Sequence, residues 1–122
     1  MIIGVLGIIR KDNKYLLGLE TKDNAFKGKW RLLGGKVEEN ETFEQALIRE
    51  LEEEAQIQIK IVKKLEVYPG KNMPINIFLA DWVKGEIKIK KDENEKIEFF
   101  TADEAKKLDT EKLTKDVLNR YI

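Results

Sequence analysis

The segment TFEQALIRELEEEA, residues 42–55, most constrains how this chain can fold, because its apolar residues recur at the spacing of an amphipathic helix. Thr42 and Gln45 fit a capping box, in which the threonine oxygen accepts from the third helical amide and the glutamine side chain reaches back. The sequence therefore predicts a helix over residues 42–55 that lays one apolar stripe on a core.

Glutamates interrupt this stripe. If Phe43 is set at zero, a rotation of about 100° per residue puts Glu50 at about −20° and Glu54 at about +20°, in the middle of the apolar face. Glu53 lies at the edge of that face, at about −80°, and Glu52 points away from it. Buried carboxylates are costly unless a cation or hydrogen-bond donors meet them. The pattern indicates a site on the buried face of the helix.

A solvated acidic helix is the alternative. Arg49 and Glu53, one turn apart, would then form an exposed ion pair worth about 0.3–0.5 kcal/mol. That pair does not account for Glu50 and Glu54, so we favour a cation site. The chain has no histidine and no cysteine, which leaves oxygen ligands. Such ligands suit Mg²⁺ or Mn²⁺, and Mg²⁺ is commonly completed by the phosphates of a substrate.

Composition excludes several other classes of protein. At 122 residues we expect one domain, residues 1–122, with a core of its own. Lysine plus arginine and aspartate plus glutamate both number 23, so no net charge would attract nucleic acid or a membrane. The apolar start, MIIGVLGII, is too short to span a bilayer and lacks a basic leader. We expect a soluble cytoplasmic protein, either monomer or homodimer.

Strand patterns lie on both sides of the central helix. A hairpin over residues 2–20 precedes it, the glycine pair Gly34-Gly35 marks a break, and helices follow near the end of the chain. This order suggests an α/β (α+β) domain, layered α/β/α, with a mixed sheet. The other expected strands span residues 57–68, 75–83, 86–90 and 97–100, and the later helices span residues 102–108 and 111–121.

Read from Gly35, the chain gives glycine, five residues, Glu41, seven residues, and then RELEEEAQI from Arg49. This closely resembles the Nudix box, GX5EX7REUXEEXGU, where U is a bulky apolar residue. One position differs, because Gln56 replaces the glycine that ends the helix. A left-handed cap costs a non-glycine residue about 1 kcal/mol or more. Asn40, in place of another common glycine, tolerates that conformation.

The resemblance implies a Nudix-type α/β/α sandwich and assigns roles to individual residues. Arg49 would orient the glutamates by salt bridges, and Glu41 would support the loop and the start of the helix. Gly34 and Gly35 would let the backbone pass close to the metal. Lys36 would contact phosphate or, as an alternative, be an exposed strand lysine. The implied ligands of Mg²⁺ or Mn²⁺ are Glu50, Glu53 and Glu54.

Members of this family usually add one acidic residue from a later loop, as a metal ligand or general base. Asp92, Glu93, Glu95 and Glu98 lie in that region. We prefer Glu95, with Glu93 second. A solvated loop charge is the alternative for each of them.

The implied activity is Mg²⁺-dependent hydrolysis of a nucleoside diphosphate linked to another group. The chain looks like the MutT-type branch, so a nucleoside triphosphate, with oxidised purine forms among the candidates, would give the monophosphate and pyrophosphate. ADP-ribose and dinucleoside polyphosphates are alternative substrates. A non-catalytic nucleotide-binding module of the same fold is the alternative of another class.

Overall fold

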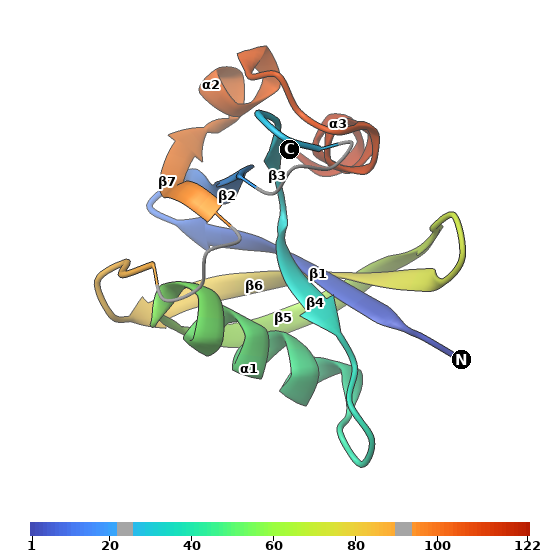
Figure 1. Cartoon of the computed structure of the whole chain (residues 1–122). Coiled ribbons are helices and arrows are strands. Elements are labelled where there is room, and N and C mark those ends of the chain that lie inside the picture. Colours follow the sequence, from blue (N-terminus) through green and yellow to red (C-terminus); the bar gives the residue numbers. More distant parts are fainter. Residues whose placement is uncertain (22–25, 90–93) are drawn as a thin grey trace.

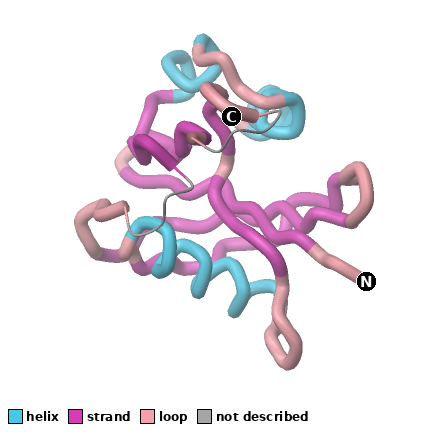
Figure 2. Tube along the Cα trace, viewed as in Figure 1, coloured by secondary structure: helices cyan, strands magenta, loops and turns pink. Residues whose placement is uncertain are grey.

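The computed structural model describes residues 1–21, 26–89 and 94–122. These residues form a seven-stranded mixed sheet with helices on both faces, as Figures 1 and 2 show. The predicted α/β/α sandwich is confirmed. In chain order the elements are β1 (Gly4–Lys11), β2 (Lys14–Glu20), β3 (Trp30–Arg31), β4 (Leu33–Lys36), α1 (Phe43–Ala55), β5 (Gln58–Pro69), β6 (Pro74–Lys84), β7 (Asn94–Thr101), α2 (Ala102–Lys107) and α3 (Lys112–Tyr121).

Strand β1 organises the sheet, whose order is β3-β2-β1-β6-β5. It pairs in parallel with β6 and antiparallel with β2. Strand β4 pairs antiparallel with the first half of β1, and β7 pairs antiparallel with β2. The β1–β2 turn is formed by Asp12 and Asn13, both left-handed with φ of 50° and 63°, as tight hairpin turns require. The predicted hairpin is therefore present.

The two faces of the sheet carry separate cores. Helix α1 covers one face and α2 with α3 cover the other (Figure 1). The α1 core contains Val5, Ile9, Leu16, Leu33, Ala46, Leu47, Leu51, Ala55, Ile57, Ile59, Phe78, Ala80 and Ile97. The opposite core contains Ile8, Leu17, Leu32, Ile77, Ala105, Leu113, Val117 and Leu118. Alternate residues of β1 and β2 thus supply both layers, which explains why these two strands are apolar almost throughout.

Two expectations about local structure were wrong. The glycine pair is not a break but part of β4, where Gly34 and Gly35 pair with Leu6 and Val5. The segment 86–89 forms no strand in the described chain. This segment lies beside the C-terminal end of α1 instead, because the Lys88 amide donates to the Ala55 carbonyl at 3.0 Å.

Candidate active site

Helix α1 presents its glutamates in the pattern that its periodicity predicts. Thr42 caps it, with the Gln45 amide donating to the Thr42 hydroxyl and the Thr42 amide donating to the Gln45 side chain. Glu50 is 8% exposed and Glu54 2% exposed, whereas Glu52 is exposed. The predicted burial of two carboxylates on the apolar face is confirmed.

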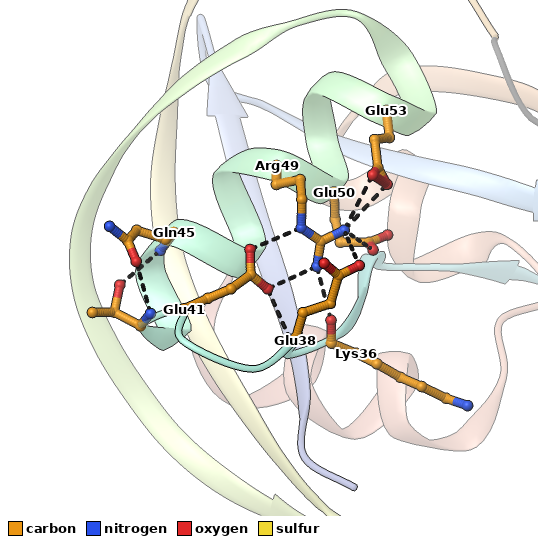
Figure 3. A network of polar contacts seen from close by, with 8 residues as sticks. Lys36, Glu38, Glu41, Gln45, Arg49, Glu50 and Glu53 are labelled. Carbon is orange, nitrogen blue, oxygen red and sulfur yellow. Dashed lines mark hydrogen bonds and ion pairs between the residues drawn. The ribbon is translucent and has the colours of Figure 1, made fainter.

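Arg49 is the centre of the polar network that Figure 3 shows. Its Nε and Nη2 donate to the two carboxylate oxygens of Glu41 at 2.8 and 2.9 Å. Its Nη1 donates to Glu50 at 2.8 Å and to Glu53 at 3.2 Å. Nη2 also donates to the Lys36 carbonyl at 3.0 Å. The guanidinium therefore joins the glycine-rich strand, the loop before α1 and two glutamates of α1.

Glu41 fixes the loop between β4 and α1. Its Oε1 accepts from the Glu38 amide at 2.8 Å while both oxygens accept from Arg49. The charge-assisted bonds from Arg49, and then the bond from the Glu38 amide, lower the pKa of Glu41 to about 2. The Glu38 carboxylate also lies 3.6 Å from Arg49 Nη1. Sequence reasoning missed Glu38, although its position three residues before Glu41 is the spacing of a local turn.

Strand β4 lies directly against Glu50. A Cβ placed on Gly35 would be 2.4 Å from Cδ of Glu50, closer than real Cβ atoms approach. A Cβ on Gly34, whose φ is 156°, would lie 2.0 Å from the Val5 carbonyl oxygen. Lys36 is turned the other way: its carbonyl faces Arg49, while its side chain points away from the network (Figure 3). The two glycines thus bring bare backbone to the buried carboxylate.

The two replacements in the motif take the backbone conformation of the missing glycines. Gln56 ends α1 with φ of 57° and ψ of 35°, and its amide donates to the Glu52 carbonyl. Asn40 has φ of 63°. Both residues are left-handed. Gln56 therefore carries the expected conformational cost of a left-handed non-glycine residue, and α1 still ends at Ala55, directly before it.

Of the later acidic residues, the structure describes Glu95 and Glu98. Glu95 lies on β7 and lines a shallow hollow with Ile87, Ile89 and Glu98. Within the described residues, no three carboxylates are gathered closely enough to hold a metal ion. Asp92 and Glu93 lie outside the described residues. The choice among these later acids therefore stays a prediction.

The donors of α1 nevertheless fit a hard divalent cation. Glu50, Glu53 and Glu54 offer only carboxylate oxygens from adjacent turns, which is the donor set that Mg²⁺ prefers. Gly35 leaves room for the carboxylate of Glu50 beside the backbone. As the side chains stand, Glu50 and Glu53 both accept from Arg49. Cation binding would thus draw Glu53 at least partly away from the guanidinium.

Comparison with known proteins agrees with this arrangement. A family model described as NUDIX domain matches residues 1–121. The chain belongs to the Nudix family. An ADP-ribose pyrophosphatase from Methanocaldococcus jannaschii is 40% identical to it over 95% of this chain and 72% of its own length. An 8-oxo-dGTP diphosphatase from Proteus vulgaris is 34% identical over 69% of this chain and 79% of its own length.

Solved Nudix structures share the whole architecture. A NUDIX hydrolase from Nitrosomonas europaea superposes with a TM-score of 0.88 at 28% identity, covering 98% of this chain and 69% of that one. A MutT NUDIX hydrolase from Burkholderia pseudomallei gives 0.80 at 25% identity, covering 98% and 97%. This Nudix chain is accordingly a pyrophosphohydrolase that acts on phosphoanhydride bonds. None of its described helices is long and apolar enough to cross a membrane.

Proposed function

We propose that the protein hydrolyses the diphosphate of ADP-ribose, with Mg²⁺ or Mn²⁺ held by Glu50, Glu53 and Glu54 and by Glu95 from the later segment. The observation that supports the catalytic assignment is the burial of Glu50 and Glu54 on the face of α1 that meets Gly35. The substrate is proposed because the ADP-ribose pyrophosphatase relative aligns with 95% of the chain. The non-catalytic alternative is not favoured, since both relatives described above are named as enzymes.

The reaction adds water across one phosphoanhydride bond. The water oxygen bonds to phosphorus, the bond to the bridging oxygen breaks, and AMP and ribose 5-phosphate leave. When bound, a divalent cation would neutralise charge on the diphosphate and make hydroxide available near neutral pH. With no histidine or cysteine in the chain, the proton of the attacking water would pass to a carboxylate, for which Glu50 and Glu54 are the candidates.

The neighbouring residues would hold these carboxylates in place. Arg49 positions Glu50 and Glu53 through its Nη1, while its other two nitrogens are fixed by Glu41. Gly34 and Gly35 would let the backbone of β4 lie directly against Glu50. Lys36 carries an exposed ammonium group at the end of that strand, and its contact with phosphate is part of the proposal.

A nucleoside triphosphate is the second candidate substrate. The 8-oxo-dGTP diphosphatase relative and the MutT structure support it, and the products would be the monophosphate and pyrophosphate. The sequence alone favoured a nucleoside triphosphate. We place ADP-ribose first because the ADP-ribose pyrophosphatase relative aligns with 95% of this chain, whereas the 8-oxo-dGTP diphosphatase relative aligns with 69%. A single domain, a cytoplasmic location, a monomer or homodimer, and the lack of a nucleic-acid partner remain predictions.

Turnover on a panel of substrates tests this proposal. Purified protein with Mg²⁺ is given ADP-ribose, dGTP, 8-oxo-dGTP, and diadenosine polyphosphates, and the products are separated by chromatography. We expect the highest kcat/KM for ADP-ribose and no measurable turnover in Glu53→Gln. Glu52→Gln, on the exposed side of the same helix turn, is the matched control and should retain activity. A preference for 8-oxo-dGTP would establish the second candidate instead.

A further inference from the structure

Glu38 is an acidic residue beside Arg49 that has no part in the catalytic mechanism described above. Its Oε1 lies 3.6 Å from Nη1 of Arg49, beyond the length of a hydrogen bond. Figure 3 shows its carboxylate facing the guanidinium. Its side chain is 66% exposed, so water can solvate it as it stands. Glu38 is thus a solvent-facing anion next to the residue that organises the glutamates of α1.

The hydrogen-bond donors of Arg49 are fully engaged. A guanidinium has five N–H groups. Nε and Nη2 donate three of them, to the two oxygens of Glu41 and to the Lys36 carbonyl. Nη1 donates one to Glu50 at 2.8 Å and shares the other between both oxygens of Glu53, each at 3.2 Å. With these donors in use, Arg49 attracts Glu38 by charge, across the 3.6 Å gap.

The bond from Arg49 to Glu53 is the one most easily given up. Its length of 3.2 Å lies at the long end of the range for N–H···O bonds, whereas the bonds to Glu41 and Glu50 measure 2.8 to 2.9 Å. The Glu53 side chain is also 37% exposed, against 14% for Glu41 and 11% for Glu50. Because Glu53 is a proposed ligand of the divalent cation, its oxygens would leave Nη1 when the site is loaded. One N–H of Arg49 would then need another acceptor.

The loop before α1 holds Glu38 where it can replace Glu53. The Glu38 amide donates to Oε1 of Glu41 at 2.8 Å, and Arg49 binds both oxygens of Glu41. The main chain of Glu38 is thus tied through Glu41 to the same guanidinium. Rotation of its exposed side chain would close the gap to Nη1, and exposed side chains change rotamer within nanoseconds.

We propose that Glu38 is a positioning residue that accepts the Nη1 hydrogen of Arg49 when Glu53 turns to the cation. One charge-assisted hydrogen bond then replaces another, and Arg49 keeps its bonds to Glu41 and Glu50. Glu38 thereby lowers the free energy needed to release Glu53 from the guanidinium. This inference rests on the proposed function, because it requires the cation site at α1, but it is independent of the substrate.

Urea unfolding without metal tests whether Glu38 and Glu53 compete for Arg49. Glu53→Ala removes one acceptor from Nη1, so Glu38 should bond to Arg49 in that variant even with no cation present. Glu38→Ala should therefore lower the urea midpoint further in the Glu53→Ala background than in the wild type, where Arg49 is bonded to Glu53. Glu39→Ala, which removes another exposed glutamate of this loop, should shift the midpoint equally in both backgrounds. The same shift for Glu38→Ala in both backgrounds would overturn the exchange.

Calorimetric titration with Mg²⁺ tests the consequence for cation binding. Glu38→Ala should weaken Mg²⁺ binding about fivefold, because an N–H of Arg49 loses its acceptor in the loaded state. Glu38→Gln removes the same charge but keeps an oxygen acceptor, so its loss of affinity should be smaller. Glu39→Ala is the control for charge near the site and should change the affinity less than Glu38→Gln does. Equal losses in Glu38→Ala and Glu38→Gln would indicate a long-range effect of charge and would contradict the proposal.

Failure of the exchange and failure of the proposed function give different results. If the wild type binds Mg²⁺ and hydrolyses ADP-ribose while Glu38→Ala matches Glu39→Ala in Mg²⁺ affinity, the exchange is wrong and the proposed function stands. If the wild type binds no Mg²⁺ at α1, both fail together.

Discussion

The carboxylate of Glu50 occupies the space that a side chain on Gly35 would need. Its Cδ and two oxygens lie 2.4 to 2.7 Å from the position of a Cβ on that glycine. The absence of a side chain on β4 therefore determines where a buried carboxylate of α1 can lie.

Replacing Gly35 by alanine should displace Glu50. We expect kcat to fall at least tenfold, and overpacking should lower the free energy of unfolding by about 1–3 kcal/mol. Steady-state kinetics and urea unfolding measure the two effects. Gly28→Ala is the control, because Gly28 has φ of 78° and open space around it; it should lose some stability through backbone strain but keep its kcat. Wild-type kcat in Gly35→Ala would show that the contact is unimportant.

Arg49→Lys should reduce both the stability of the fold and kcat, although the substitution keeps the positive charge. A lysine ammonium cannot bind both oxygens of Glu41 and also reach Glu50 and Glu53. Loss of these partly buried bonds should cost about 1–3 kcal/mol of unfolding free energy and reduce kcat. Arg120→Lys changes an exposed pair with Glu66, so its effect should stay below about 1 kcal/mol. Equal urea midpoints for the two variants would argue against a central role for Arg49.

Acid should weaken the loop before α1. The pKa of Glu41 is lowered to about 2 in the folded protein, from an ordinary value of 4.5. A lowered pKa stabilises the fold fully above pH 4.5, and this contribution is lost as pH falls toward 2. Thermal unfolding between pH 6 and pH 2.5 should therefore show a Tm that drops more steeply in the wild type than in Glu41→Gln. Parallel curves would contradict the assignment.

Gln56→Gly should stabilise the protein. Gln56 is left-handed with φ of 57°, and glycine adopts that conformation without the side-chain penalty of about 1 kcal/mol. Urea unfolding should show a gain of about that size. Gln58→Gly, on the exposed start of β5, should instead lose about 0.5–1 kcal/mol. A loss of stability in Gln56→Gly would mean that the glutamine side chain makes a compensating contact.

Local periodicity was sufficient to predict α1 and the burial of Glu50 and Glu54, because both follow from the rotation per residue of a helix. The left-handed Asn40 and Gln56 were anticipated from the resemblance to the Nudix box, in which glycine stands at both positions. Local pattern failed for Gly34 and Gly35, since glycine signals a break whereas pairing with β1 makes this segment a strand.

Contacts that cross the fold could not be read from local pattern. The strand expected at residues 86–90 depended on alternation, but the Lys88 amide bonds to the end of α1. The buried pair of Glu20 and Arg31 and the position of Asn94 depend on the register of three strands. The spacing of residues in the sequence does not reveal that register. The choice of Glu95 among the later acids could not be made from sequence for the same reason, because Glu95 lies on β7.

Mg²⁺ binding at α1 is tested most directly by calorimetric titration of wild type, Glu54→Gln and Glu52→Gln, followed by ADP-ribose turnover on the same samples. Both substitutions remove one carboxylate from the same helix, but Glu54 is buried and Glu52 is exposed. We predict stoichiometric Mg²⁺ binding and turnover in wild type and Glu52→Gln, and at least tenfold weaker binding with no measurable turnover in Glu54→Gln. Wild-type Mg²⁺ affinity and turnover in Glu54→Gln would contradict the assignment of this helix face as the catalytic site.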